Sequence, residues 1–430
     1  MVIKRDRYLE KLISKQNNGM IKVITGLRRC GKSFLLFELY RDYLISSGVP
    51  ENNILCIPLD DVDYEEYCDP HKLHTYIKEQ VNDPEQQYYV FIDEAQYAIS
   101  KEEMKNPDVP IRLYGVLNSL LRKRNVDVYI TGSNSKFLSS DIMTEFRGRG
   151  DEVHIAPLSF SEYFPASGLN KMDAWKEDLY YGGLPHILAE MGDEAKSNYL
   201  EKLNREIYLR DIYERYDMRE EAGMESLMKV VASAVGSLTN PQKISATFMI
   251  NGYKGISIPT ISNYLKYLQE SFVIQKAERY DIKGRKYIGT PSKYYYSDLG
   301  LRNSLLNFRQ FEETHLMENV IYNELRSRGY SVDVGVVEKR TTDETGKSVR
   351  KQLEIDFVAN LGSKRYYIQS AFSMPTEEKS LQEKASLVNV NDSFKKIVIV
   401  KDVVNITRDL DGITTMSIYD FLLKENSLEL

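Results

Sequence analysis

The stretch that decides the fold class is Gly26-Leu27-Arg28-Arg29-Cys30-Gly31-Lys32-Ser33, which fits the phosphate-loop pattern G-x-x-x-x-G-K-S/T. A β-type run, residues 21–25, leads into it, and an apolar helical run beginning at Phe34 leads out. Glycines let backbone N–H groups turn toward phosphates, and the N-terminus of the following helix favours negative charge. The loop and Phe34 therefore predict a nucleotide site, in which Lys32 contacts the β- and γ-phosphates and the Ser33 hydroxyl binds Mg²⁺.

A second motif is an apolar strand that ends in two acids, Tyr88-Tyr89-Val90-Phe91-Ile92-Asp93-Glu94. We expect Asp93 to hold the Mg²⁺ and Glu94 to polarise the attacking water. A buried strand that ends in a solvated acidic turn is the plain structural alternative. Taken with the phosphate loop, the acid pair predicts ATP and Mg²⁺ as cofactors, and Lys32 and Glu94 as catalytic residues.

Two further segments offer catalytic candidates. The run 126–131 reads as a strand and ends at Thr131-Gly132-Ser133-Asn134, where Ser133 or Asn134 could orient the water; a strand-terminating turn is the alternative. The segment Phe146-Arg147-Gly148-Arg149-Gly150 follows. Either arginine, Arg149 being our candidate, could compensate transition-state charge on a neighbouring subunit's γ-phosphate. Either could equally be a surface cation.

The first third of the chain alternates strands and helices. We expect strands at 21–25, 54–59, 88–93, 126–131 and 153–156, with helical patterns such as 34–45 and 111–122 between them. This alternation predicts an α/β fold, with a parallel sheet covered by helices on both faces.

Composition excludes several classes of protein. The chain has 430 residues, of which 42% are hydrophobic and 28% charged, the balance of a soluble globular protein with several domains. No run approaches the ~18 apolar residues of a membrane span, so we expect a cytoplasmic protein without a membrane partner. Three cysteines without a CxxC pair, and five histidines without metal-ligand spacing, argue against a disulfide framework and a zinc site.

The phosphate loop, the acid strand YVFIDEAQ and the runs ITGSNS, FRGRG and PLSFSEYF, in this order, resemble an AAA+-type P-loop ATPase. More narrowly, the chain resembles bacterial and archaeal ATPases that join such a core to a further C-terminal half and are similar to STAND-type NTPases. The resemblance implies a core at 1–165 and a helical lid at 166–238. It also implies that Tyr181-Gly182-Gly183-Leu184-Pro185 is a GxP-like motif, in which Pro185 approaches the adenine. Residue chemistry alone indicates only a tight turn.

Residues 239–306 read as a winged-helix module. The window from Thr239 to Arg302 contains ten basic and four acidic residues, whereas the whole chain carries a net charge of −6. A helical pattern at 258–268 precedes a basic hairpin that contains Lys283, Arg285 and Lys286. Such a wing contacts phosphate in nucleic-acid binders, so double-stranded DNA is one candidate partner. Protein docking or oligomerisation is the alternative.

The last segment, 307–430, resembles the PD-(D/E)xK nuclease fold: a helix carrying Glu318 precedes a strand with Asp356 and a strand with Gln369. That chemistry needs a second acid and a lysine two residues later. Here those positions hold Gln369 and Ala371, so we expect the fold to be kept without cleavage, with Glu318, Asp356 and Gln369 as a degenerate site.

Three hypotheses follow. The leading one is a Mg²⁺-dependent ATPase whose nucleotide state drives a conformational switch, coupled to DNA through the hairpin. The second is an ATP-gated DNA nuclease. The third is a nucleotide-controlled interaction or assembly module with an unknown protein partner, as an oligomer or otherwise, and without a DNA role.

Overall fold

The computed structural model describes residues 2–106, 108–132, 148–216, 218, 221–250, 256–342, 348–402 and 404–430. The chain forms two compact units, residues 1–157 with 270–272, and residues 158–269 with 273–430. Within the described ranges, no helix is both long and apolar enough to cross a membrane.

The first unit contains the strands β1 (Ile21–Gly26), β2 (Ile54–Pro58), β3 (Tyr88–Asp93), β4 (Val126–Thr131) and β5 (Gly150–Ile155). Its helices are α1 (Asp6–Ser14), α2 (Lys32–Phe34), which continues as a π-helix (Leu35–Tyr40) into α3 (Arg41–Ser46), α4 (Pro70–Gln80), α5 (Lys101–Lys105) and α6 (Arg112–Leu121). Short 3₁₀ turns cover Glu51–Asn53, Val62–Cys68 and Ala95–Ala98.

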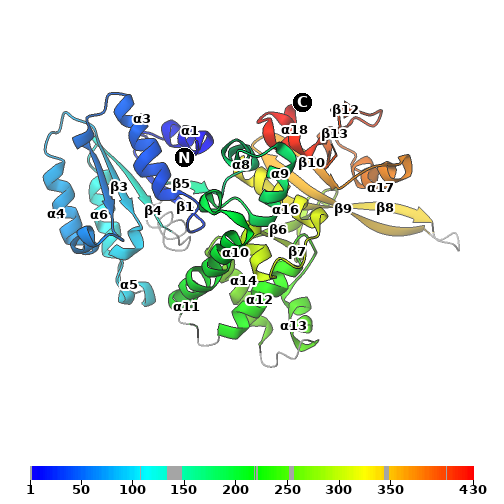
Figure 1. Ribbon diagram of the computed structural model, residues 1–430, viewed down its shortest axis with the longest axis horizontal. Helices are drawn as coiled ribbons and strands as arrows, with labels where there is room; N and C mark the ends of the chain where they lie inside the picture. The colour runs from blue at the N-terminus through cyan, green and yellow to red at the C-terminus, as the bar shows by residue number, and fades with distance from the viewer. Residues whose placement is uncertain are drawn as a thin grey trace. The chain divides into compact units, whose positions relative to one another are not determined.

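The five strands of this unit form one sheet in the order β2-β3-β4-β1-β5, and every pairing is parallel. Alternate side chains cover opposite faces. Val90 and Val128 pack with residues of α4 and α6, whereas Phe91 and Tyr129 contact Tyr40 at the end of the π-helix. Figure 1 shows helices on both sides of this sheet. The predicted parallel α/β core with these five strands is thereby confirmed.

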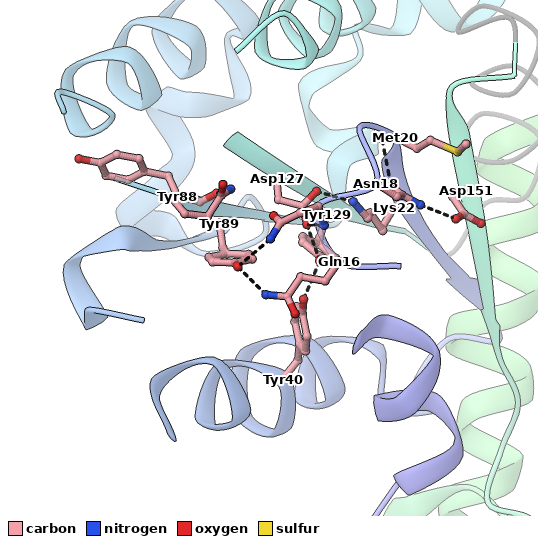
Figure 2. A network of polar contacts seen from close by, with 12 residues as sticks. Gln16, Asn18, Met20, Lys22, Tyr40, Tyr88, Tyr89, Asp127, Tyr129 and Asp151 are labelled. Carbon is pink, nitrogen blue, oxygen red and sulfur yellow. Dashed lines mark hydrogen bonds and ion pairs between the residues drawn. The ribbon is translucent and has the colours of Figure 1, made fainter. Parts of the chain in front are cut away.

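A buried polar network joins the amino ends of β1 and β4 (Figure 2). The Lys22 ammonium, fully buried, forms an ion pair with Asp127. Asp127 also accepts from the Tyr129 hydroxyl at 2.8 Å, and the Tyr129 and Tyr40 hydroxyls lie 2.6 Å apart. Burial lowers the pKa of Lys22, and Asp127 partly offsets that effect. Because Lys22 stands opposite Tyr129 in the register, a one-residue slip of β1 would break the network.

The second unit contains the strands β6 (Ile274–Asp281), β7 (Lys286–Tyr296), β8 (Ser331–Thr342), β9 (Ser348–Leu361), β10 (Lys364–Ala371), β11 (Lys395–Val400), β12 (Thr407–Arg408) and β13 (Ile413–Ser417). Its helices are α8 (Phe160–Ser167), α9 (Lys171–Tyr181), α10 (Gly192–Lys202), a π-helix (Leu203–Leu209), α11 (Arg210–Tyr216), α12 (Glu221–Ser233), α13 (Pro241–Ile250), α14 (Ile258–Glu270), α15 (Leu299–Leu305), α16 (Glu313–Ser327), α17 (Glu377–Val388) and α18 (Ile418–Leu423), with 3₁₀ turns at Pro185–Ala189 and Ser427–Glu429.

The eight strands of the second unit form one mixed sheet in the order β12-β13-β11-β10-β9-β8-β6-β7. The antiparallel pair β6–β7 is the expected basic hairpin, and α14 is the helix expected before it. Strand β6 also pairs with β8 in parallel, with Tyr280 opposite Gly335. The hairpin and the C-terminal segment therefore share one sheet, which the expected boundary between 306 and 307 did not anticipate. The winged-helix and nuclease-like assignments stay predictions.

Candidate functional sites

The phosphate loop connects the carboxyl end of β1 to α2. Gly26 has φ 144°, and a Cβ atom built there would lie 2.2 Å from the Ile155 carbonyl oxygen, so no larger residue fits without a shift of β5. Arg29 and Gly31 also have positive φ, at 63° and 98°. A non-glycine residue with a positive φ, here Arg29, stores about 1–2 kcal/mol of backbone strain. Strain of this size is typical of binding loops.

Arg5 ties the phosphate loop to the neighbouring strand. Its guanidinium donates to the Cys30 carbonyl at 3.0 Å and to the Ala156 carbonyl at 2.7 Å. The Cys30 thiol is buried and donates to the Ile155 carbonyl at 3.4 Å. Burial raises the pKa of this thiol, which favours the unreactive protonated form. Cys30 thus packs as a small filler inside the loop.

Lys32 lies inside the curve of the loop. Its side chain is buried, and the ammonium donates to the carbonyls of Gly26 at 3.2 Å and Leu27 at 3.1 Å. Ser33 is half-buried and Phe34 exposed. A phosphate that entered the loop could take over the hydrogen bonds of Lys32 without any large movement of the backbone.

The acid pair stands at the end of β3. Asp93 is buried and accepts from the Thr131 hydroxyl, whose oxygen also accepts from the Glu94 backbone N–H at 3.2 Å. Glu94 has φ 49° and accepts from the Gln96 side-chain amide. Burial raises the pKa of Glu94, and the Lys32 ammonium partly offsets this effect. A carboxylate with a raised pKa is a stronger base once ionised.

Parallel pairing brings the two motifs to one edge of the sheet. Strands β1 and β3 both flank β4, so the loop after Gly26 and the acids after Ile92 meet at the carboxyl ends of the strands. The electrostatic influence of Lys32 on Glu94 reflects this convergence. Thr131, on the strand between them, contacts both acids and was not among our candidates.

The structure describes only one of the other predicted catalytic residues, Arg149. Ser133, Asn134 and Arg147 lie outside the described residues. Arg149 is described and exposed, and its backbone carbonyl accepts from the Ile21 N–H at 3.0 Å. Its role toward a neighbouring γ-phosphate stays a prediction.

The Gly182-Gly183 turn belongs to the second unit. A Cβ atom at Gly182 would lie 2.5 Å from the Asp298 carboxylate, and one at Gly183 would lie 2.3 Å from the Leu158 carbonyl oxygen. The Gly183 N–H donates to Asp298 at 2.9 Å. The two glycines thus allow the turn to pack against the start of α15. Pro185 follows at the start of a 3₁₀ turn, and its contact with adenine stays a prediction.

Asp178 on α9 is buried near two other carboxylates. Burial raises its pKa to about 8, with the nearby carboxylates of Asp298 and Glu324 adding to the effect. The folded protein therefore keeps a proton that the unfolded chain loses above about pH 4. We expect stability to fall as pH rises from about 4 to about 8, by at most about 1.4 kcal/mol per pH unit from this group.

Urea denaturation across this pH range checks the expectation. Asp178→Asn should flatten the slope and stabilise the protein at pH 8, whereas Asp173→Asn, an exposed change on the same helix, should leave the slope as it is. Equal slopes in the wild type and in Asp178→Asn would contradict the assignment.

The predicted degenerate nuclease residues do come together. Glu318 lies on α16, Asp356 on β9 and Gln369 on β10. The Gln369 side-chain amide donates to Asp356 at 2.7 Å, and the Ser370 N–H donates to the same carboxylate at 2.8 Å. The predicted lysine position, Ala371, is buried.

A cation that we had not singled out lies among these acids. The ammonium of Lys293, on β7, is 2.8 Å from Glu318, 2.8 Å from Glu354 and 3.5 Å from Asp356. Burial lowers the pKa of Lys293, but the three carboxylates more than offset this effect and raise it overall. Burial also raises the pKa of Asp356 to about 7. The lysine is thus held as a permanent cation and is a poor base. In the described ranges, no three His, Cys, Asp or Glu side chains are grouped to hold a metal ion.

Comparison with known proteins agrees with the nucleotide-site geometry. An AAA domain model matches residues 18–164, and a model of a domain of unknown function (DUF8612) matches residues 172–312. An uncharacterized protein of Haemophilus influenzae is 33% identical over 429 residues, 98% of this chain and 99% of that protein. The chain belongs to the same family. Its N-terminal part is an AAA domain of the P-loop ATPase type.

Other similarities are more distant. An uncharacterized protein of Methanocaldococcus jannaschii is 26% identical, over 93% of this chain and 87% of its own length. Among solved structures, the Aeropyrum pernix ORC1 protein in complex with DNA is 15% identical over 71% of this chain and 93% of that chain, with a TM-score of 0.28. A TM-score this low indicates nothing about the function of this chain.

The basic hairpin of β6 and β7 is exposed at its turn, where Lys283, Arg285 and Lys286 lie. Asn263 and Lys266 are exposed on α14, and Thr260 is half-buried beside Ser257. The structure thus presents the expected cations on the surface. Two of the ten basic residues between 239 and 302, Lys293 and Arg302, are buried instead, and Lys293 lies in the buried half of β7 against the carboxylates.

Proposed function

We propose that the protein is a Mg²⁺-dependent ATPase that binds ATP or ADP at the carboxyl ends of strands β1, β3 and β4. The observation that carries the proposal is the convergence of the phosphate loop with the acid pair, in which the Lys32 ammonium acts electrostatically on a half-buried Glu94. The AAA domain match at residues 18–164 supports the same reading.

The proposed roles follow from the chemistry of each side chain. Residues 26–34 cradle the phosphates, Lys32 neutralises phosphate charge and Glu94 takes a proton from the attacking water. The Ser33 hydroxyl and the Asp93 carboxylate are oxygen ligands of the type that Mg²⁺ prefers, so the residues present fit the ion. Bound there, Mg²⁺ would neutralise charge on the β- and γ-phosphates. Thr131 positions both acids through its hydroxyl.

In this proposal the nucleotide state moves a helical lid (166–238), where Pro185 approaches the adenine, and a winged-helix module (239–306). Arg149 and Asn134 complete the catalytic set, with Arg149 acting on a neighbouring subunit. The exposed Lys283, Arg285 and Lys286 are proposed to contact the phosphates of double-stranded DNA.

A nuclease activity in the 307–430 segment is disfavoured by its carboxylate cluster. Gln369 donates a hydrogen bond to Asp356 where a second acid would bind metal, and Lys293 already neutralises Glu318 and Glu354. We therefore propose a domain that keeps the nuclease-like arrangement as a structural ion cluster and does not cleave DNA.

ATP turnover with and without double-stranded DNA, at ~50 and ~200 mM salt, tests the coupling. We expect DNA to stimulate turnover at the lower salt concentration and the stimulation to fade at the higher one. Changing Lys283, Arg285 and Lys286 together to glutamine should remove the stimulation but keep basal turnover. Turnover indifferent to DNA at both salt concentrations would instead favour a protein partner.

A further inference from the structure

The hairpin formed by β8 and β9 extends beyond the sheet to which it belongs. Strand β6 pairs with β8 only as far as Val336, and β10 pairs with β9 only from Phe357 onward. Beyond these points six residue pairs, from Val337 opposite Leu353 to Thr342 opposite Ser348, join β8 and β9 to each other. In the described part of the chain, no third strand pairs with this ribbon. Six pairs span about 20 Å, and Figure 1 shows the ribbon projecting from the sheet.

The ribbon places like charges opposite each other. Lys339 stands opposite Lys351, and Arg340 opposite Arg350. Lys351 and Arg350 are exposed, and Lys339 is half-buried. Such pairs destabilise an antiparallel ribbon, and a two-stranded ribbon alone is only marginally stable. Glu338, 3.7 Å from Arg350, offsets part of this charge. The arrangement weakens the fold locally and becomes favourable once an anion lies against it.

The turn of the β6–β7 hairpin lies where the ribbon begins. The Ile282 N–H donates to the Val336 carbonyl at 3.1 Å, and Asp281 stands opposite Val336 in the register. The cations at 283, 285 and 286 therefore lie at the same end of the sheet as the ribbon. One basic surface thus combines a short turn and a long ribbon. Residues 343–347, between the two strands of the ribbon, lie outside the described residues.

We propose that the β8–β9 ribbon enters a groove of double-stranded DNA while the β6–β7 turn contacts the adjacent phosphates. The major groove of B-form DNA, about 12 Å wide, admits a two-stranded β-ribbon. Basic side chains on both faces of the ribbon suit a site enclosed by two phosphate backbones. This proposal rests on the DNA coupling proposed above and adds a surface that the charge of residues 239–302 did not indicate.

Binding of the full chain to a fluorescent duplex, followed by anisotropy over a salt series, tests the ribbon. The variant Lys339→Gln/Lys351→Gln is compared with Lys379→Gln/Lys424→Gln, which removes the same charge from one half-buried and one exposed lysine outside this surface. We expect the ribbon variant to bind about 10-fold or more weakly at ~100 mM salt and to lower the salt slope by about two. The control variant should bind as the wild type does. Basal ATP turnover should be unchanged in both variants, and the ribbon variant should unfold at no lower temperature than the wild type, because it loses a destabilising like-charge pair.

The other outcomes separate this proposal from the proposed function. Weaker binding in the Lys283, Arg285 and Lys286 variant, with wild-type binding in the ribbon variant, would overturn the ribbon and keep the DNA coupling. No binding of duplex by the wild type, with normal ATP turnover, would overturn both DNA proposals and keep the ATPase. A ribbon variant that changes the oligomeric state in sedimentation, with DNA binding intact, would assign the ribbon to a second copy of the chain and overturn the proposal.

Discussion

Glu94→Gln is expected to lower ATP turnover by about 100-fold or more while nucleotide binding is retained. Glutamine keeps the size of Glu94 and its place beside Gln96, but it cannot accept a proton from water. Because Lys32 and Ser33 are untouched, the phosphate loop should still hold ATP. Single-turnover hydrolysis and equilibrium binding of a labelled nucleotide measure the two properties separately.

The matched control for this variant is Glu85→Gln, an exposed change in the same unit before β3. It should turn over ATP at the wild-type rate. Unchanged turnover in Glu94→Gln would refute the assignment of Glu94 as the base, and loss of binding together with turnover would mean that Glu94 supports the loop instead.

Lys293→Met is expected to destabilise the protein by about 3–5 kcal/mol, because it leaves three buried or half-buried carboxylates without their cation. Methionine matches the lysine stem in length, so the loss reflects charge rather than a cavity. Urea denaturation monitored by circular dichroism measures the free energy of unfolding. Adding Glu318→Gln and Asp356→Asn to Lys293→Met should recover much of the loss.

Lys364→Met is the matched control, since it removes a lysine from an exposed ion pair with Glu429. Exposed pairs of this kind contribute at most about 1 kcal/mol. Equal stability of the Lys293→Met and Lys364→Met variants would show that the cluster is solvated and that Lys293 is not its counterion.

The nucleotide core was predictable because its signals are local. A buried parallel strand is a short apolar run, and the phosphate loop needs glycine at fixed spacing, as the close approach of Ile155 to Gly26 explains. The acid pair at the end of β3 was equally predictable from the sequence. Thr131 was not, since a threonine at the end of a strand has the same pattern whether or not its hydroxyl reaches two acids.

The C-terminal half was harder to predict because its decisive contacts are distant in sequence. Lys293 lies 25 residues before Glu318 in a stretch of mixed charge, and nothing local distinguishes a buried lysine from an exposed one. The pairing of β6 with β8 depends on strand order, which no periodicity encodes. Only the resemblance to the PD-(D/E)xK nuclease fold predicted that Glu318, Asp356 and Gln369 lie together.

Arg5 gives the segment before α1 a structural role in the nucleotide site. Its guanidinium connects the carbonyls of Cys30 and Ala156, one in the phosphate loop and one directly after β5. A shortened chain that began after residue 5 would keep every residue of the phosphate loop and yet lose the brace behind it. An affinity tag fused at Met1 would stand four residues from that brace. Nucleotide affinities measured on trimmed or tagged versions would then describe a looser loop than the one the intact chain folds.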